Sequence, residues 1–127
     1  MASSKDLQRV SRWRRQLLDL RDEAARLLEV CLGPQPLLKG SVYRLKRKCG
    51  RPSCRCARGQ LHATMVLSWS QDGRTRLRVI PKNQVTPLQA LTQRYRQVRR
   101  VRARLVKIHA QVRRLIDRLE AARRQGA

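Results

Sequence analysis

The feature that most constrains this chain is a cluster of residues that commonly bind metal ions: three cysteines and one histidine in the segment CGRPSCRCARGQLH. Glycines and a proline between them permit the tight turns that bring such side chains together. Three thiolates and one imidazole complete the tetrahedral shell that zinc prefers, and leave no position for water. We therefore predict a structural Zn²⁺ site, a zinc knuckle, formed by Cys49, Cys54, Cys56 and His62.

The same cluster has two other interpretations, which are reduced free thiols in a basic loop and a disulfide between Cys49 and Cys54. A zinc deaminase needs a glutamate two residues after its histidine, where this chain has Thr64. The amino-terminal segment contains no apolar signal core, and no stretch reaches the apolar length of a membrane span. We expect a cytoplasmic protein, and a reducing cytoplasm disfavours the disulfide.

Basic residues dominate the chain, whose formal net charge of +23 is unevenly distributed. Residues 1–38 carry +2, residues 39–82 carry +11 and residues 83–127 carry +10. A field of this sign attracts polyanions, and nucleic acid is the commonest polyanion in a cell. A generic solvated surface and an anionic membrane are the alternatives. Because arginine outnumbers lysine and is the better phosphate ligand, we expect DNA or RNA as the partner and no membrane association.

Apolar residues recur at alternating steps of three and four residues in both terminal segments, as in coiled-coil helices. We predict one helix over 4–31, and a second over 86–124 with Thr86 as its cap and Pro87 in its first turn. The helices can form an antiparallel hairpin or pair with a second copy in a homodimer. The predicted seams are Val10, Trp13, Leu17, Leu20, Ala24, Leu27 and Cys31, then Leu91, Tyr95, Val98, Val101, Leu105, Ile108, Val112, Leu115, Leu119 and Ala122.

Residues 40–82 have the alternating pattern of a small antiparallel sheet. Strands are expected over 41–48, 63–69 and 74–79, with Asp72-Gly73 as the hairpin turn between the last two. We expect one apolar face that packs on the helices and one face that carries a row of arginines. The predicted fold class is α+β, as a single domain over 1–127 in which the two long helices flank the sheet and knuckle.

Two sets of cations are candidate nucleic-acid contacts. The sheet and knuckle would form one continuous patch if the strands pair as expected, and the second helix is rich in arginine, although its cations are equally compatible with the solvated side of a coiled coil. The candidates are Arg44, Lys46, Lys48, Arg51, Arg55, Arg58, Arg74, Arg76 and Arg78, then Arg94, Arg96, Arg99, Arg100, Arg102, Arg104 and Lys107.

The few aromatic residues are assigned to the interior. Trp13 lies on a seam, and Tyr43 and Trp69 are expected in the core rather than as platforms for base stacking. Cys31 is expected to be a small apolar seam residue, and His109 an ordinary helical side chain rather than a ligand or base.

Acidic residues are too sparse for metal-dependent catalysis on nucleic acid. Asp72 is the only one between Glu29 and Asp117, and Asp favours turns for conformational reasons alone. A nuclease or transposase needs converging carboxylates, and neither a phosphate loop nor a Ser-His-Asp arrangement is present. We expect that the protein is not an enzyme.

The segment from Gly40 to Pro81 resembles an uncharacterised family of small prokaryotic proteins with a C-G-x-P-x-C-x-C-A-x-G-x-x-H core. The resemblance implies the same knuckle, a hairpin and a following long helix, and its members often lie near transposase genes. Thr64, Met65 and Val66 replace the Pro and tyrosines that usually follow the histidine in that family. The resemblance itself implies no activity.

These observations predict a non-catalytic, zinc-containing nucleic-acid-binding protein, accessory to a larger nucleic-acid-processing system such as a mobile element. If DNA is the partner, the protein would be associated with the nucleoid. One alternative is an adaptor whose coiled-coil helices dock on a nucleic-acid enzyme. Another is a ribonucleoprotein component that binds structured RNA.

Overall fold

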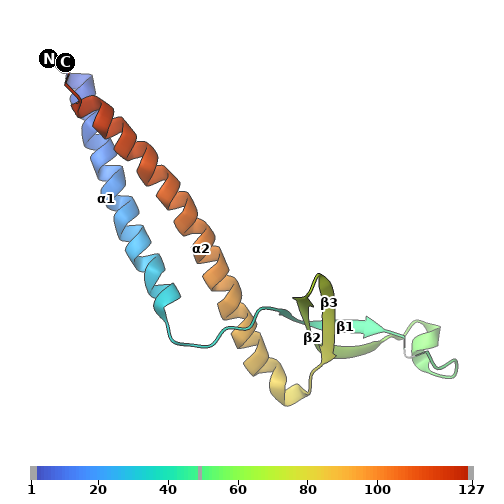
Figure 1. Ribbon diagram of the computed structural model, residues 1–127. Helices are drawn as coiled ribbons and strands as arrows, with labels where there is room; N and C mark the ends of the chain where they lie inside the picture. The colour runs from blue at the N-terminus through green and yellow to red at the C-terminus, as the bar shows by residue number, and fades with distance from the viewer. Residues whose placement is uncertain (1–2, 49, 126–127) are drawn as a thin grey trace. The chain divides into compact units, whose positions relative to one another are not determined.

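The computed structural model describes residues 3–48 and 50–125 and has an α+β fold (Figure 1). Helix α1 (Ser4–Leu32) is followed by strand β1 (Ser41–Arg47), the 3₁₀ turn η1 (Arg55–Arg58), strands β2 (His62–Gln71) and β3 (Arg74–Val79), and helix α2 (Lys82–Arg123). The strands form one antiparallel sheet in the order β1-β2-β3. The predicted α+β class, with a small antiparallel sheet and two long helices, is therefore confirmed, and the strands lie within two residues of their predicted positions.

The chain divides into two compact units. The helix unit contains α1 and the part of α2 from Val98 onward, and the sheet unit contains residues 35–97. Helix α2 contributes its first part to the sheet unit and the remainder to the helix unit, so both units depend on this one element.

The amino terminus of helix α1 is capped by reciprocal hydrogen bonds between Ser3 and Asp6. The Ser3 Oγ accepts a hydrogen bond from the Asp6 N–H at 3.1 Å, and the Ser3 N–H donates to Asp6 Oδ2 at 3.2 Å. These two bonds satisfy amide groups that the helix itself cannot pair. The Ser3 Oγ–H also donates to Asp6 Oδ2 at 2.8 Å, and this bond, together with the one from the Ser3 N–H, lowers the pKa of Asp6 because both favour the charged carboxylate. The helix ends at Leu32, one residue beyond the predicted end, and Gly33 and Pro34 follow it.

In the helix unit, α1 and the later part of α2 run antiparallel to each other (Figure 1). Val101, Ile108 and Leu115 of α2 are buried at 8%, 3% and 6% exposure and form the core of the pair. The seam prediction was wrong at Cys31, which is exposed while Val30 is partly covered. It was also wrong at Ala122 of α2, which is exposed.

Helix α2 begins at Lys82, four residues before the predicted start, so Pro87 lies inside the helix. The reason lies at the end of β3, where the Ile80 N–H donates to the Met65 carbonyl at 2.9 Å and the Ile80 side chain is 4% exposed. These contacts hold the backbone in place directly before Pro81, and α2 begins at the residue that follows Pro81. Proline has no backbone N–H group, so Pro87 removes one hydrogen-bond donor from the second turn of α2.

The strand register gives the two sheet faces a different composition from the one predicted. Lys46 pairs with Ala63, and Arg76 with Trp69, so cations of both edge strands share a face with apolar residues of β2. Val66 and Leu67 point to opposite faces and are 0% and 6% exposed, so the centre of β2 is covered on both sides. The predicted row of arginines on one face is therefore confirmed, and Leu77 and Val79 lie on the other face, but the arginine face also carries the apolar residues of β2 that were expected on the apolar face. The face defined here as the mixed face carries Val42, Arg44, Lys46, Ala63, Met65, Leu67, Trp69, Gln71, Arg74, Arg76 and Arg78.

Candidate metal centre and basic surfaces

The loop between β1 and β2 contains the turns that position the predicted metal ligands. Gly50 and Gly59 have φ values of 84° and 100°, which side chains other than glycine rarely adopt. The Ala57 N–H donates to the Cys54 carbonyl at 3.1 Å, and the Gly59 N–H to the Cys56 carbonyl at 3.3 Å. This short 3₁₀ turn keeps the two cysteines together before the chain reverses at Gly59 toward the start of β2.

Three of the four predicted ligands converge. The Sγ atoms of Cys54 and Cys56 and a ring nitrogen of His62 lie within 4.8 Å of one another. The Sγ of Cys54 is 3.0 Å from the Nε2 of His62. Tetrahedral zinc with Zn–S of about 2.3 Å and Zn–N of about 2.0 Å separates its ligand atoms by about 3.5–3.8 Å. The cluster therefore fits a small metal ion, whereas the predicted ligand Cys49 lies outside the described residues.

The surroundings of the cluster are basic. A cavity of about 660 Å³ beside it is lined by Arg47, Lys48, Arg51, Cys54, His62, Ala63 and Thr64. Cys56 is fully buried, and His62 is exposed at the mouth. The buried Thr64 Oγ1 makes no hydrogen bond with the part of the chain that the structure describes. A metal held here would be anchored from the interior by Cys56 and would face solvent beside cations.

The candidate cations of the sheet lie on one face. Arg44 and Lys46 of β1 and Arg74, Arg76 and Arg78 of β3 all belong to the mixed face and are exposed. They form a diagonal band, since the β3 arginines flank the carboxy-terminal part of β2 and the β1 cations flank its amino-terminal part. No acidic side chain lies on this face, and within residues 3–48 and 50–125 none of the five has an ion-pair partner.

Four further candidate contacts, the knuckle cations, lie in the chain between β1 and β2. Lys48 follows β1, Arg51 lies in the loop, and Arg55 and Arg58 lie in η1. All four are exposed.

The basic stretch of α2 is divided between intramolecular contacts and exposed cations. Arg94 donates to the Pro36 carbonyl at 3.3 Å, and Arg96 to the Ser41 Oγ at 3.0 Å. Arg104 donates to both carboxylate oxygens of Glu23, at 2.7 and 2.9 Å. The other four predicted contacts on the helix are exposed, and their side chains have no hydrogen-bond or ion-pair partner among the described residues; they are Arg99, Arg100, Arg102 and Lys107.

The Arg104–Glu23 pair joins the two helices of the helix unit. Its hydrogen bonds lower the pKa of Glu23 and raise that of Arg104, because each side chain stabilises the charged form of the other. Sequence reasoning missed this contact because the residues are 81 positions apart and both occupy the edge of a seam.

The aromatic residues are less buried than predicted. Tyr43 is 39% exposed, and Trp69 is only partly covered. The assignment of Tyr43 to the core was therefore wrong, because β1 is an edge strand and its residue 43 lies on the face opposite the mixed face. Trp13 is partly covered on the seam of α1, and His109 is exposed on α2.

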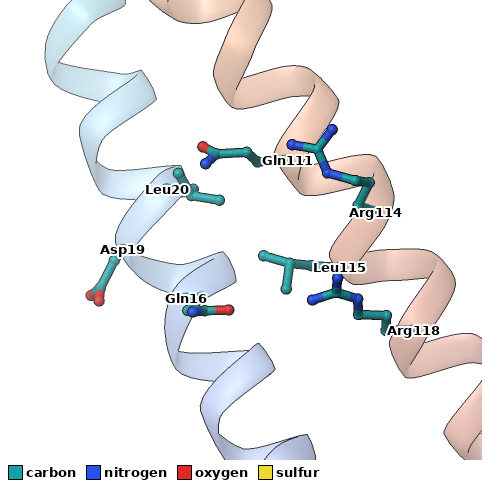
Figure 2. Close-up of a pocket in the computed structure, with 7 residues that line it drawn as sticks. All are labelled: Gln16, Asp19, Leu20, Gln111, Arg114, Leu115 and Arg118. Carbon is teal, nitrogen blue, oxygen red and sulfur yellow. The ribbon is translucent and has the colours of Figure 1, made fainter.

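A cavity that the sequence did not indicate lies between the helices of the helix unit (Figure 2). Its volume is about 350 Å³, and its lining is Gln16, Asp19, Leu20, Gln111, Arg114, Leu115 and Arg118. Leu20 and Leu115 point toward each other, while Asp19 points away from α2 (Figure 2). The Gln111 Oε1 is buried without a hydrogen-bond partner among the described residues. The cavity therefore marks a loosely packed part of the helix pair, with no acid positioned for chemistry.

In the described parts of the chain, neither helix has the length and apolarity needed to cross a membrane.

Comparison with known proteins identified one family. No curated protein and no solved structure matched the chain. A family model described as a domain of unknown function, DUF6788, matches residues 7–90, about two thirds of the chain. The matched region includes most of α1, the whole Cys/His loop and all three strands. The chain therefore belongs to the DUF6788 family.

Proposed function

We propose that this protein binds nucleic acid through the sheet unit and does not act on it chemically. The observation that carries the proposal is the register of the sheet, which gathers the exposed side chains of Arg44, Lys46, Arg74, Arg76 and Arg78 on one face that carries no acid. Unpaired arginines concentrated on one side of a small unit are suited to neutralising phosphates. Asp72 lies in the hairpin turn with φ 52°, where it serves the backbone conformation.

We propose zinc as the metal, with Cys49 as the fourth ligand alongside Cys54, Cys56 and His62. Cysteine and histidine together favour zinc over calcium or magnesium, which take oxygen ligands. Three thiolates around a divalent ion leave one negative charge, and Arg47, Lys48 and Arg51 lie beside the site to offset it. With four protein ligands the ion supplies structure: it fixes the loop that carries the knuckle cations.

The exposed cations of α2 form a second contact surface in the proposal, made by Arg99, Arg100, Arg102 and Lys107. Arg94, Arg96 and Arg104 are left out, because their hydrogen bonds hold the fold. The biological role that follows is an accessory factor for a larger nucleic-acid-processing system, including mobile elements.

The test is a fluorescence anisotropy titration of nuclease-treated protein with duplex DNA, single-stranded DNA and structured RNA at several salt concentrations. Each phosphate neutralised contributes about 0.7–0.9 to the slope of log affinity against log salt. Replacing Arg74, Arg76 and Arg78 by Gln should therefore reduce the slope by about 2 and weaken binding about tenfold or more near 0.15 M salt.

The matched control is Gln at Arg9, Arg12 and Arg14, three exposed arginines of α1, which removes the same charge from the other unit. It should leave most of the affinity intact. Equal loss in both triple variants, or weak binding to all three polyanions that disappears with added salt, would show that the charge is generic.

A second candidate, a protein adaptor, is favoured by exposed leucines on α1. Leu7, Leu18, Leu28 and Leu32 are 62%, 45%, 48% and 72% exposed. In this role the helix pair would be a short coiled coil that adds a partner helix along these leucines. Gln at Leu18 and Leu28 should then abolish assembly while leaving nucleic-acid affinity unchanged, as judged by sedimentation and anisotropy. Substituting a buried seam residue such as Ile108 would not test docking, because this side chain is 3% exposed and its loss would unfold the helix pair itself.

A further inference from the structure

The mixed face has an aromatic side chain among its cations. Trp69 lies on the central strand β2, is partly exposed, and stands directly opposite Arg76 of β3. On its other side lies Gly40, where a Cβ atom would be 3.7 Å from the Trp69 Cβ and 2.8 Å from the Ser68 carbonyl oxygen. Trp69 is therefore flanked by an arginine and by a residue that has no side chain and has no room for one.

The indole N–H, the only polar group of the Trp69 side chain, has a hydrogen-bond partner on the same face of the sheet. The Trp69 Nε1–H donates to the Gln71 Oε1 at 3.3 Å, and the two residues are neighbours on one side of β2. This bond occupies the only hydrogen-bond donor of the indole, so a ligand would contact the ring through its apolar surface. An aromatic face with no polar requirement of its own stacks on any nucleobase.

Arg74, Arg76 and Arg78 run beside this aromatic residue. Alternate residues of a strand are about 6.6 Å apart, so the three guanidinium groups form a row along β3. Every residue of β3 is exposed, which allows an extended chain to lie along it. A polyanion in this position would place phosphates on the arginines and direct its bases toward β2.

Base pairing decides which nucleic acid fits. In a duplex the base faces are stacked on one another, and only the edges are available in the grooves. An indole can stack only on a base that is unpaired. Phosphate binding alone would need no aromatic residue on this face.

We propose that the mixed face binds single-stranded nucleic acid, with an unpaired base stacked on Trp69 and neighbouring phosphates on Arg74, Arg76 and Arg78. This rests on the proposed function and narrows its substrate class to single-stranded DNA or RNA.

Trp69 itself provides the measurement. The chain has two tryptophans, so Trp13→Phe leaves Trp69 as the only indole reporter. This variant is titrated with oligothymidine, oligouridine and an abasic oligonucleotide of the same length and charge, with anisotropy measured in parallel. The thymidine and uridine arms distinguish DNA from RNA. We expect quenching of Trp69 by at least one of them, whereas the abasic strand binds about tenfold more weakly without quenching.

Two variants separate stacking from structure. Trp69→Leu should bind base-containing and abasic strands equally, and Trp69→Phe should keep part of the difference. Tyr43→Leu is the matched control, since Tyr43 is an exposed aromatic residue on the opposite face and its loss should not change base dependence. Circular dichroism verifies that each variant folds.

The outcomes distinguish the two proposals. If no polyanion binds, the proposed function itself fails. If base-containing and abasic strands bind the Trp13→Phe protein equally and leave Trp69 fluorescence unchanged, stacking is wrong while phosphate binding stands. Tighter binding of a duplex of the same length than of the single strand also overturns the inference.

Discussion

At the scale of single residues, Cys56 is the most constrained member of the metal cluster. It is fully buried, and it lies in η1 between two exposed arginines. A thiolate in such a position requires a partner charge, because burial disfavours an unpaired anion. The close approach of Cys54 and His62 provides the remaining donors for a cation that would supply this charge.

Cys56→Ser should reduce the bound metal from about one ion per chain to near zero, because serine is a poor ligand for zinc at neutral pH. Metal content after gentle purification, measured by plasma mass spectrometry, checks this. Cys31→Ser is the control, since Cys31 is exposed on α1, and it should keep full metal content. A native protein without metal would refute the site, and full retention by Cys56→Ser would exclude Cys56 as a ligand.

Single residues also explain why the aromatic assignment failed. A composition poor in aromatic residues suggests that each one is needed in the core. Tyr43 and Trp69, however, both lie on a small three-stranded sheet, which does not fully bury either of them. The exposure of Tyr43 follows from the edge position of β1, whereas Trp69 on the central strand β2 is partly covered. That information is absent from the alternation of a single strand.

At the scale of elements, the helix pair is held by an apolar seam with a polar contact at its edge. The core positions Val101, Ile108 and Leu115 repeat at seven-residue intervals, and the Arg104–Glu23 pair fixes the alignment of one helix against the other. Gln111 interrupts this packing with a buried carbonyl oxygen that has no partner in the described chain. Part of the seam therefore contributes little stability.

The Arg104–Glu23 contact predicts a pH dependence of the helix unit. The folded pKa of Glu23 is below its ordinary value of 4.5, so the contact stabilises the fold above that pH, and its contribution is lost as pH falls through the folded pKa. Glu23→Gln should lower the thermal midpoint at neutral pH, and the difference from the native protein should vanish in acid. Thermal unfolding followed by circular dichroism across this range checks the prediction.

Glu29→Gln is the matched control, because Glu29 is exposed on the same helix and has no ion-pair partner among the described residues. A pH-independent difference between Glu23→Gln and the native protein would contradict an electrostatic role for Glu23.

At the scale of the whole molecule, the two units have separate cores. The buried apolar residues of the sheet unit are Cys56, Val66, Leu67 and Ile80, whereas those of the helix unit are Val101, Ile108 and Leu115 of α2. The candidate metal ligands Cys54, Cys56 and His62 lie in the sheet unit. Loss of the metal should therefore affect one unit far more than the other.

Metal removal by a chelator should unfold the knuckle and perturb the sheet while most of the helical signal remains. The Trp13→Phe protein reports this directly, because a change in Trp69 emission follows the sheet unit and ellipticity follows the helices. Adding back Zn²⁺ should restore the emission. Simultaneous loss of both signals would show that the units unfold cooperatively, and no change in either after complete metal loss would show that metal does not support the fold.

The sequence alone determined the elements that depend on local chemistry. Alternation predicted the three strands, Asp72-Gly73 predicted the hairpin, and seven-residue spacing predicted most of both seams. Ligand residues separated by short glycine-containing turns converge for reasons contained in the loop itself, which is why Cys54, Cys56 and His62 were found from spacing.

Only the tertiary structure decided features that depend on contacts between distant segments. The register of β2 with its two neighbours put Trp69 and five cations on one face, and the hydrogen bond of Ile80 to β2 moved the start of α2 to Lys82. The pairing of helices removed Arg104 from the exposed cations by giving it Glu23. In each case the deciding partner is remote in the chain, and a local pattern carries no information about which remote group will be adjacent.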